Sequence, residues 1–299
     1  MLPFLTDSAL DALLADDVPL GDLTTHALGI GEMSGRMTFD ARAPMVLAGA
    51  EDAGRLLARA GCTVELWASS GTALKAGDAI LSARGTALSL HRGWKVAQTL
   101  IEIASGIASV TRGIVEAARA VAPDVAVACT RKTVPGAKAL SIGAILAGGA
   151  VPHRLGLSET VLVFEEHRRF LGDLSPAAAV AQLHRAVPEK KVVVEVADVA
   201  EGLLWAEAGA DVIQAEKFSP EDIAALVGAL REKGLSTVVA AAGGINPDNA
   251  ADYAASGARV LVTSAPYTAK PRDVQVRIAP FETTAPIGFF ERDKKPAQG

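Results

Sequence analysis

The sequence predicts an α/β protein whose C-terminal two-thirds forms a parallel β-sheet covered by helices. From about residue 123 onward, short apolar runs rich in Val and Ile alternate with segments of helical spacing. Such continuous apolar runs are typical of strands that are buried on both faces of a parallel sheet. About six strands at this spacing fit either a closed barrel or an open, doubly wound sheet.

The N-terminal region, roughly the first hundred residues, predicts a mixed α+β unit. Asp7 or Ser8 can cap a short helix over Leu10–Leu14. Two small residues, Ser105 and Gly106, lie within a later long helix, where they permit either close packing of another segment or a break. The remaining predicted helices and strands are Arg36–Arg42, Glu51–Ala60, Cys62–Trp67, Ala79–Ala83 and the long helix Trp94–Ala120.

The C-terminal region carries clear start signals for its helices. A capping residue followed by proline opens a helix at Ser175-Pro176, Ser219-Pro220 and Asn246-Pro247, and Asp198 caps another. The predicted strands that alternate with these helices are Val125–Cys129, Thr160–Phe164, Lys191–Val196, Asp211–Ala215, Thr237–Ala241 and Arg259–Val262.

Composition and charge exclude several classes of function. The 299-residue chain is half apolar and has a net charge of −5, which argues against a broad nucleic-acid-binding face. The acidic N-terminus lacks the basic region of a secretory signal, and no apolar run approaches the length of a membrane span. We therefore expect a cytoplasmic protein with neither nucleic-acid nor membrane partners. Cys62 and Cys129 lie in separate apolar stretches, so we expect both to be buried and reduced.

Polar residues follow the predicted strands at the edge where parallel α/β sheets bind their ligands. This set combines cations, carboxylates and a glycine pair, which random surface loops rarely supply together. In chain order the set is Thr130-Arg131-Lys132, Phe164-Glu165-Glu166, Glu195, Glu216-Lys217, Gly243-Gly244 and Ser264.

Two basic pairs predict an anion site. Arg131 offers a planar fork to a carboxylate or phosphate, and Lys132 offers a point charge. His153 and Arg154 follow a glycine-rich stretch, which lets a ligand approach the backbone closely. The alternatives are a solvated loop for the first pair and a structural histidine for the second.

Two carboxylates and the glycine pair predict metal and phosphate contacts. Glu195 interrupts the apolar run VVVEV and Glu216 ends the next strand, so a site for Mg²⁺ and sugar hydroxyls fits both. Gly243 and Gly244 lead toward the helix expected at Asn246, whose N-terminus would favour a phosphate. The alternatives are a structural ion pair for the carboxylates and a structural turn for the glycines.

The order of these motifs resembles the quinolinate phosphoribosyltransferase family, and within it the ModD-like branch associated with molybdenum transport. The resemblance spans nearly the whole chain. It begins at Gly21-Asp22-Leu23-Thr24-Thr25 and continues through Ser105-Gly106-Ile107-Ala108. The most specific motifs are TRKT…PG over residues 130–136 and HRxGL over residues 153–157.

The resemblance implies the architecture and the assembly. It implies an N-terminal open α/β sandwich over residues 1–110 and an irregular α/β barrel of about six parallel strands over residues 111–275. Residues 276–299 would return toward the N-terminal domain and end in a frayed tail. It also implies a homodimer, in which the partner's N-terminal domain completes each site.

The resemblance implies a role for each motif residue. The acid's carboxylates would be held by Arg131, His153 and Arg154, and the phosphates by Lys132. Ribose and Mg²⁺ would be held by Glu195 and Glu216, with Lys132 completing the catalytic set. The 5′-phosphate would be held by Gly243, Gly244 and Ser264.

This chain also departs from the family's pattern. Lys95 stands at the position of an arginine, and Phe164 opens the segment that reads KDNH in the family. Glu216 and Lys217 replace an Asp-Asn pair, and Ser264 replaces a glycine. The exchange at Phe164 removes a cation from the acid's side of the site, so we expect an acceptor less anionic than quinolinate.

We therefore expect a transferase that moves phosphoribosyl from phosphoribosyl pyrophosphate (PRPP) to an aromatic or heterocyclic acceptor, with Mg²⁺, and releases pyrophosphate. One alternative is a genuine quinolinate phosphoribosyltransferase of NAD biosynthesis. Another is a non-catalytic protein that binds a phosphorylated metabolite or an oxyanion such as molybdate.

Overall fold

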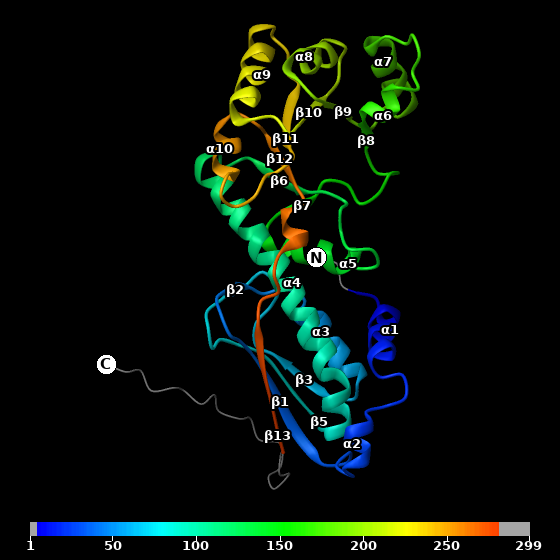
Figure 1. Ribbon diagram of the computed structural model, residues 1–299, viewed down its shortest axis with the longest axis vertical. Helices are drawn as coiled ribbons and strands as arrows, with labels where there is room; N and C mark the ends of the chain where they lie inside the picture. Colours follow the sequence, from blue (N-terminus) through cyan, green and yellow to red (C-terminus); the bar gives the residue numbers. More distant parts are fainter. Residues whose placement is uncertain (1–4, 281–299) are drawn as a thin grey trace, which may run out of the picture.

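The computed structural model describes residues 5–280 and shows an elongated molecule built around two separate sheets (Figure 1). A four-stranded antiparallel sheet lies at one end, and a seven-stranded sheet lies at the other. Helix α4 (Ala87–Val121) runs from one to the other and packs against elements of both. It also crosses residue 110, where the sequence places a domain boundary.

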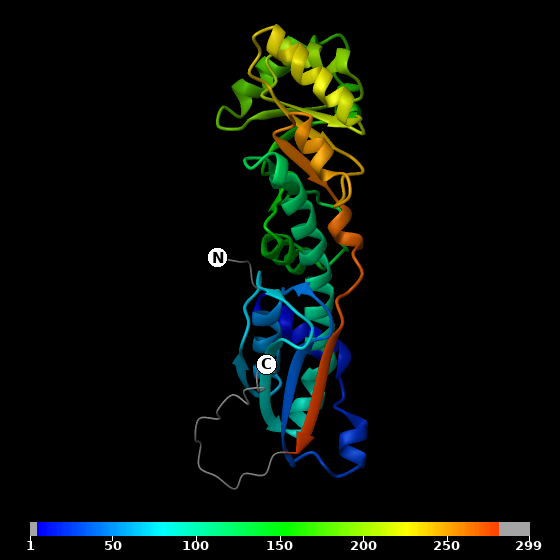
Figure 2. The same ribbon diagram turned by 90° about the vertical axis from the view of Figure 1, so that its left-hand side faces the viewer.

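The N-terminal sheet has the order β13-β1-β5-β3 and is covered by helices on one face. Beside this sheet, β2 and β4 pair with each other as a separate two-stranded sheet. The elements of this part of the chain are α1 (Asp7–Asp17), α2 (Leu23–Ala27), β1 (Ser34–Ala41), β2 (Met45–Val46), α3 (Ala50–Arg59), β3 (Thr63–Leu66), β4 (Ala73–Leu74), β5 (Ala79–Thr86) and β13 (Val274–Pro280). Strand β13 follows the second sheet in sequence and pairs antiparallel with β1, so the chain returns to its starting domain (Figure 2). The frayed tail predicted from the sequence lies outside the described residues.

The start of α1 differs from the prediction by one residue. Thr6 caps the helix: its backbone is extended and its side-chain oxygen accepts a hydrogen bond from the backbone N–H of Ala9 at 3.2 Å. The prediction of Asp7 or Ser8 as the cap is therefore wrong. Asp7 instead lies in the first helical turn, where its charge favours the positive end of the helix dipole.

The second sheet is parallel throughout and forms a half-barrel. Its order is β7-β6-β12-β11-β10-β9-β8, and β7 and β8 are edge strands that do not pair with each other. Its strands are β6 (Ala126–Cys129), β7 (Val151–Pro152), β8 (Val161–Val163), β9 (Val192–Val196), β10 (Val212–Glu216), β11 (Val238–Ala242) and β12 (Val260–Thr263). Six of these were predicted; β7 was not, because two residues give no periodic signal.

The helices of the half-barrel confirm three of the four predicted caps. Ser175, Asp198 and Ser219 each accept a hydrogen bond from the backbone of the first turn. The helices are α5 (Lys138–Gly148), α6 (Glu165–Arg168), α7 (Pro176–Ala186), α8 (Val199–Glu207), α9 (Pro220–Glu232), α10 (Ala250–Ala255) and the 3₁₀ turn η1 (Ala265–Thr268).

The cap predicted at Asn246 is wrong, because α10 begins later, after Asn249. The side chain of Asn246 is engaged in a local turn, where it accepts a hydrogen bond from the N–H of Asp248 at 2.9 Å. Asn249 folds back and accepts from the N–H of Asn246 at 2.8 Å. The glycine pair at 243–244 therefore leads into this turn and not directly into a helix.

Both cysteines are buried and free, as predicted. Burial raises the pKa of Cys62 to about 11 and that of Cys129 to about 12, so neither thiol ionises at neutral pH. Among the helices of residues 5–280, none is long and apolar enough to cross a membrane.

The small pair Ser105-Gly106 serves close packing, and α4 runs through it without a break. A Cβ atom on Gly106 would lie 2.5 Å from the carbonyl oxygen of Lys270, in the segment that leads back to β13. Ser105 accepts a hydrogen bond from the N–H of Ala48 at 3.0 Å. Helix α4 and the returning chain can therefore approach only where the side chain is absent.

We predict that Gly106→Ala lowers the free energy of unfolding by about 1–3 kcal/mol, since the backbone of Lys270 cannot move aside cheaply. The matched control is Gly113→Ala on the same helix, where the new Cβ would meet Pro247 at an ordinary 3.5 Å. The control should be neutral or more stable by up to about 1 kcal/mol. Urea denaturation of both variants tests this, and equal stabilities would contradict it.

Candidate active site

A cavity of about 580 Å³ opens at the carboxyl ends of the parallel strands. Residues that follow both edge strands line it, so the sheet curls around the cavity. The lining residues are Thr130, Arg131, Lys132, His153, Arg154, Leu162, Phe164, Glu166, Glu195, Gln214, Glu216, Lys217, Ala242, Gly243, Gly244, Val262, Thr263 and Ser264. Of the residues to which the sequence analysis assigns a role in the site, all but Lys95 line the cavity; Glu165, expected at the same edge of the sheet, does not.

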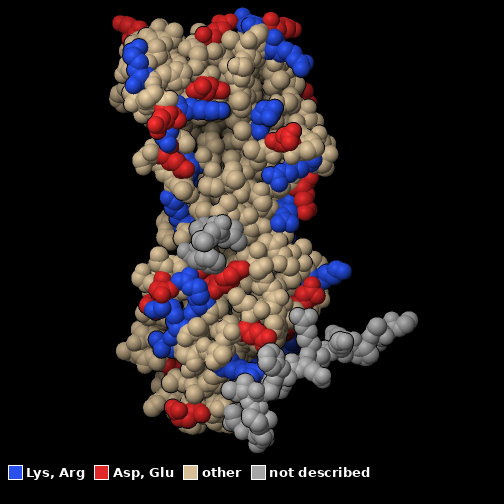
Figure 3. All heavy atoms as spheres, turned by 180° about the vertical axis from the view of Figure 1, so that it is seen from behind, with Lys and Arg blue, Asp and Glu red and all other residues tan. Residues whose placement is uncertain are grey.

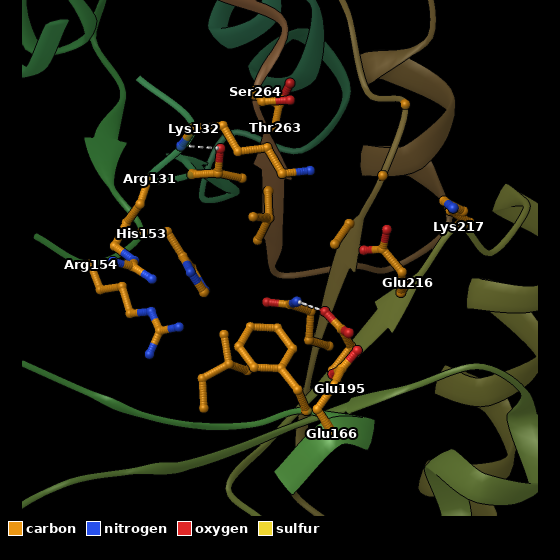
Figure 4. A pocket seen from close by; sticks show the side chains of 18 residues that line it. Arg131, Lys132, His153, Arg154, Glu166, Glu195, Glu216, Lys217, Thr263 and Ser264 are labelled. Carbon is orange, nitrogen blue, oxygen red and sulfur yellow. Dashed lines mark hydrogen bonds between the residues drawn. The ribbon is translucent and has the colours of Figure 1, made fainter. Parts of the chain in front are cut away.

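One side of the cavity is basic. Arg131, Lys132, His153 and Arg154 follow β6 and β7 and lie together in Figure 4. Within residues 5–280, none of the three Arg and Lys side chains has a carboxylate within ion-pair distance. We call these four residues the basic wall.

Arg154 is the most constrained member of the basic wall. The residue is only 7% exposed, and its guanidinium lies 5.6 Å from the centre of the Phe164 ring. Burial and the nearby charge of Arg131 both lower its pKa. A buried cation beside another cation is costly unless an anion reaches it, so the geometry favours an anionic ligand here.

His153 differs from its cationic neighbours in its charge. Burial, and then the positive charge of Arg154, lower the pKa of the imidazole below its ordinary value. The ring is therefore neutral at pH 7 in the ligand-free protein and offers one hydrogen-bond donor and one acceptor.

The opposite side of the cavity is acidic. Glu166 follows β8, Glu195 lies within β9 and Glu216 ends β10, and in the described chain none of them forms an ion pair. Burial, followed by the charge of Glu216, raises the pKa of Glu195 above its ordinary value. These three residues form the acidic wall, in which the charges of Glu216 and Glu166 repel that of Glu195 and the nearby Arg168 offsets only part of this repulsion.

The glycine turn closes the cavity between the two walls. Gly243 and Gly244 have φ values of +94° and +75°, and neither N–H group donates to an acceptor in the part of the chain that the structure describes. A Cβ on Gly243 would lie 2.9 Å from the Cγ of Lys217. Lys217 itself has a φ of +60°, an uncommon conformation for a residue with a side chain.

Polar side chains stabilise the turn by hydrogen bonds to its backbone. Asn249 donates to the carbonyl of Gly244 at 3.1 Å, and Thr263 donates to the carbonyl of Ile245 at 2.6 Å. These bonds leave the two glycine N–H groups free for a ligand, and Ser264 lies beside them at the cavity edge. The turn can bind an anion without a helix N-terminus, which the sequence had wrongly placed there.

Sequence reasoning missed one buried residue of the cavity, Gln214. It is 5% exposed, and its Nε2 donates to Glu195 Oε2 at 2.7 Å (Figure 4). The sequence does contain a signal for this residue: the polar Gln214 interrupts the apolar run VIQAE in the same way as Glu195 interrupts VVVEV. Glu166 and Lys217 were noted at strand ends but were not selected.

Lys95 is a predicted site residue that does not line the cavity. It sits on α4 beside the N-terminal sheet, exposed, with its Nζ 3.1 Å from Gln98 Oε1 and 4.7 Å from the centre of the Trp94 ring. A single chain therefore does not bring Lys95 to the cavity.

Outside the cavity, two observations describe the distribution of charged and metal-binding side chains. On the face shown in Figure 3, basic and acidic side chains are interspersed, without a broad basic patch. Among residues 5–280, no three His, Cys, Asp or Glu side chains are grouped closely enough to hold a metal ion by themselves.

Two family models match the chain in succession. The model described as the quinolinate phosphoribosyl transferase N-terminal domain matches residues 22–105, and the C-terminal domain model matches residues 107–277. Together they cover the whole seven-stranded sheet, the N-terminal sheet except for the end of β13, and every residue of the two cavity walls.

Individual relatives agree with these matches. A Rhodobacter capsulatus protein named as a ModD pyrophosphorylase is 52% identical over 85% of this chain and 97% of its own length. The human nicotinate-nucleotide pyrophosphorylase (carboxylating) is 34% identical over 83% of each chain. The crystal structure of NadC from Streptococcus pyogenes superposes with a TM-score of 0.84 at 26% identity, covering 93% of this chain and 99% of that one. The chain therefore belongs to the quinolinate phosphoribosyltransferase family, as a ModD-like member of these type II phosphoribosyltransferases.

Proposed function

We propose that the protein transfers the phosphoribosyl group of PRPP to an aromatic or heterocyclic acceptor and releases pyrophosphate. The observation that carries this proposal is the cavity with unpaired cations on one wall and unpaired carboxylates on the other. The basic wall would bind the anionic groups of a ligand, and the acidic wall would bind hydroxyl groups and a cation. PRPP together with an aromatic acid has this distribution of groups.

The basic wall would hold the anionic groups. In this proposal Arg131 and Arg154 contact the acceptor's carboxylate, and the neutral His153 donates a hydrogen bond to it. Lys132, which reaches toward the middle of the cavity, contacts the phosphates. The free N–H groups of Gly243 and Gly244, with Ser264 beside them, would bind the 5′-phosphate of the ribose.

The acidic wall would hold the ribose and Mg²⁺. The two carboxylates Glu195 and Glu216 face the same cavity, repel each other and lack a cationic partner in the described chain, so they fit a divalent cation. Because no third His, Cys, Asp or Glu within residues 5–280 is grouped with them, oxygens of PRPP would complete the coordination. When bound, Mg²⁺ would neutralise charge on the departing pyrophosphate.

The chemistry would depend on positioning and charge. As the bond from the anomeric carbon to pyrophosphate breaks, positive charge develops on the sugar and negative charge on the leaving group. Lys132 would stabilise the leaving group, and the carboxylates of Glu195 and Glu216 would lie on the side of the sugar. The acceptor forms the new bond to the anomeric carbon directly, so no side chain of the protein has to form a covalent intermediate.

Phe164 would select the acceptor. Its ring lines the cavity beside Arg154, at the position where the family's segment begins with Lys. A second carboxylate placed there would meet an apolar ring instead of a cation, and burying an unpaired charge is costly. We therefore propose a monoanionic or neutral ring as acceptor, and genuine quinolinate transfer as the alternative.

The assembly and compartment are proposed on separate grounds. We propose a homodimer in which Lys95 of one subunit reaches the cavity of the other, since Lys95 stands at the position of a family arginine but does not line the cavity of its own chain. Small molecules are the proposed ligands, with neither nucleic acid nor membrane as a partner, and the cytoplasm is the proposed compartment.

Incubation with PRPP, Mg²⁺ and a panel of heterocyclic acids and bases, followed by pyrophosphate release, tests the proposed activity. At least one acceptor should be converted, and Lys132→Ala should abolish release. A protein that binds phosphorylated ligands or molybdate but converts no acceptor would support the non-catalytic alternative.

For the acceptor, we predict that Phe164→Lys shifts the preference from nicotinate toward quinolinate by a factor on the order of 10², because one charge-assisted contact is gained. The matched control is Phe164→Leu, which removes the ring without adding a charge. The ratio of kcat/KM for the two acids measures the shift. Efficient use of quinolinate by the wild type, unchanged in Phe164→Lys, would show that Phe164 does not set specificity.

For the acidic wall, we predict that Glu216→Gln lowers the pKa of Glu195 toward its ordinary value, because the charge of Glu216 is one cause of the rise. Because the pKa of Glu195 is raised in the folded protein, ionising this carboxyl lowers the free energy of unfolding. The loss is absent at a pH below the ordinary pKa of a glutamate and complete at a pH above the raised pKa. Protonation below the raised pKa should in turn weaken Mg²⁺ binding. NMR titration of the Glu195 carboxyl carbon measures the midpoint; an unchanged midpoint would mean that the two groups do not interact.

For the dimer, we predict that Lys95→Ala and Lys132→Ala subunits are each inactive but regain part of the activity when mixed and allowed to exchange. In a mixed dimer, one site combines the intact Lys132 of one chain with the intact Lys95 of the other. Pyrophosphate release before and after mixing is the measurement. A fully active monomer, or no recovery on mixing, would contradict the shared site.

A further inference from the structure

Gln214 has a buried hydrogen-bond acceptor that the protein leaves unused. Its Oε1 is buried and has no hydrogen-bond partner within residues 5–280, although the side chain lines the cavity. The amide nitrogen is committed to Glu195 Oε2 at 2.7 Å. An ionised carboxylate only accepts hydrogen bonds, so the nitrogen must face Glu195 and the oxygen must face elsewhere. A buried acceptor of this kind indicates a missing donor.

The sheet register places Gln214 deep in the cavity. On β10 it lies opposite Glu195 of β9 and Ala240 of β11. Glu216 lies two residues further on, on the same face and nearer the mouth, because side chains alternate along a strand. Gln214 lines the cavity together with Ala242 of the neighbouring strand, whose small side chain lies one step nearer the mouth than Ala240.

The same register brings Phe164 to the level of Gln214. Val163 of β8 pairs with Val194 of β9, so the residue after Val163, Phe164, lies level with Glu195. Glu195 in turn pairs with Gln214 of β10, and we call this level of the sheet the Gln214 rung. A planar ring that lies against Phe164 would present its edge to this rung. The acceptor oxygen of Gln214 would then face the edge of the ring.

We propose that Gln214 determines which acceptor the enzyme takes: its Oε1 accepts a hydrogen bond from an N–H or O–H group of the ring. The inference rests on the proposed function, because only a phosphoribosyl acceptor would occupy this rung. The acceptor is therefore an aromatic or heterocyclic acid that carries an amino, hydroxyl or ring N–H group. A ribose hydroxyl of PRPP offers the same chemistry, but the rung shared with Phe164 favours the ring.

The test compares the full-length wild type with Gln214→Leu, whose apolar side chain of similar size suits a floor that already contains Ala240, Ala242 and Val262. Calorimetry measures the Kd of three ligands, nicotinate, 2-aminonicotinate and 6-aminonicotinate, and separately the Kd of PRPP with Mg²⁺. The wild type should bind at least one amino compound about tenfold more tightly than nicotinate. Gln214→Leu should lose this preference and should lose less affinity for PRPP than for the preferred ring, although Glu195 also loses the hydrogen bond from Gln214.

Three results would overturn the inference. They are the absence of any preference in the wild type, a preference that persists in Gln214→Leu, and a loss of PRPP affinity greater than the loss for the rings. The last result would assign the donor to the ribose, or would reduce Gln214 to a support for Glu195. Gln214→Met replaces the leucine variant if thermal unfolding shows that the latter is misfolded. Failure of the proposed function is distinct, since neither protein would then release pyrophosphate from PRPP with any acceptor, whatever the measured affinities.

Discussion

The separation of unpaired charges across the half-barrel mouth is the constraint on which the site depends. The strand order produces it: β7 and β6 carry the basic wall, and β10, β9 and β8 carry the acidic wall. Strands β12 and β11 lie between the walls and end in Thr263-Ser264 and the glycine turn, which carry no charge. Arg154 therefore cannot neutralise Glu195, and a ligand must supply both sets of counter-charges.

The rest of the fold keeps this arrangement open and rigid. Ala240, Ala242 and Val262 line the inner face of the sheet, and these small side chains leave the hollow that a tightly packed barrel would fill. Helix α4 links the half-barrel to the N-terminal sheet, and the close contact at Gly106 ties the returning chain to it. In the proposed dimer, a subunit fixed in this way would present Lys95 to its partner at a defined place.

The sequence predicted much of this structure, and the exceptions have physical causes. Apolar runs located six of the seven parallel strands, because buried strands must be continuous and hydrophobic; β7, with two residues, leaves no such pattern. The cap at Asn246 was wrong because a side chain that can cap a helix can equally stabilise a turn. Gln214 was missed although it interrupts an apolar strand, and the separation of the walls could not be predicted, since it depends on strand order and not on local pattern.

The most direct test of this account is the free energy of unfolding of the ligand-free Arg154→Met variant relative to that of the wild type. If Arg154 is held unpaired beside Arg131 for the sake of a ligand, removing its charge should stabilise the empty protein by about 1 kcal/mol or more, despite the lost contact with Phe164. Destabilisation by a similar amount would show that Arg154 is already satisfied within the fold. The cavity would then not be a site in which charges await a ligand.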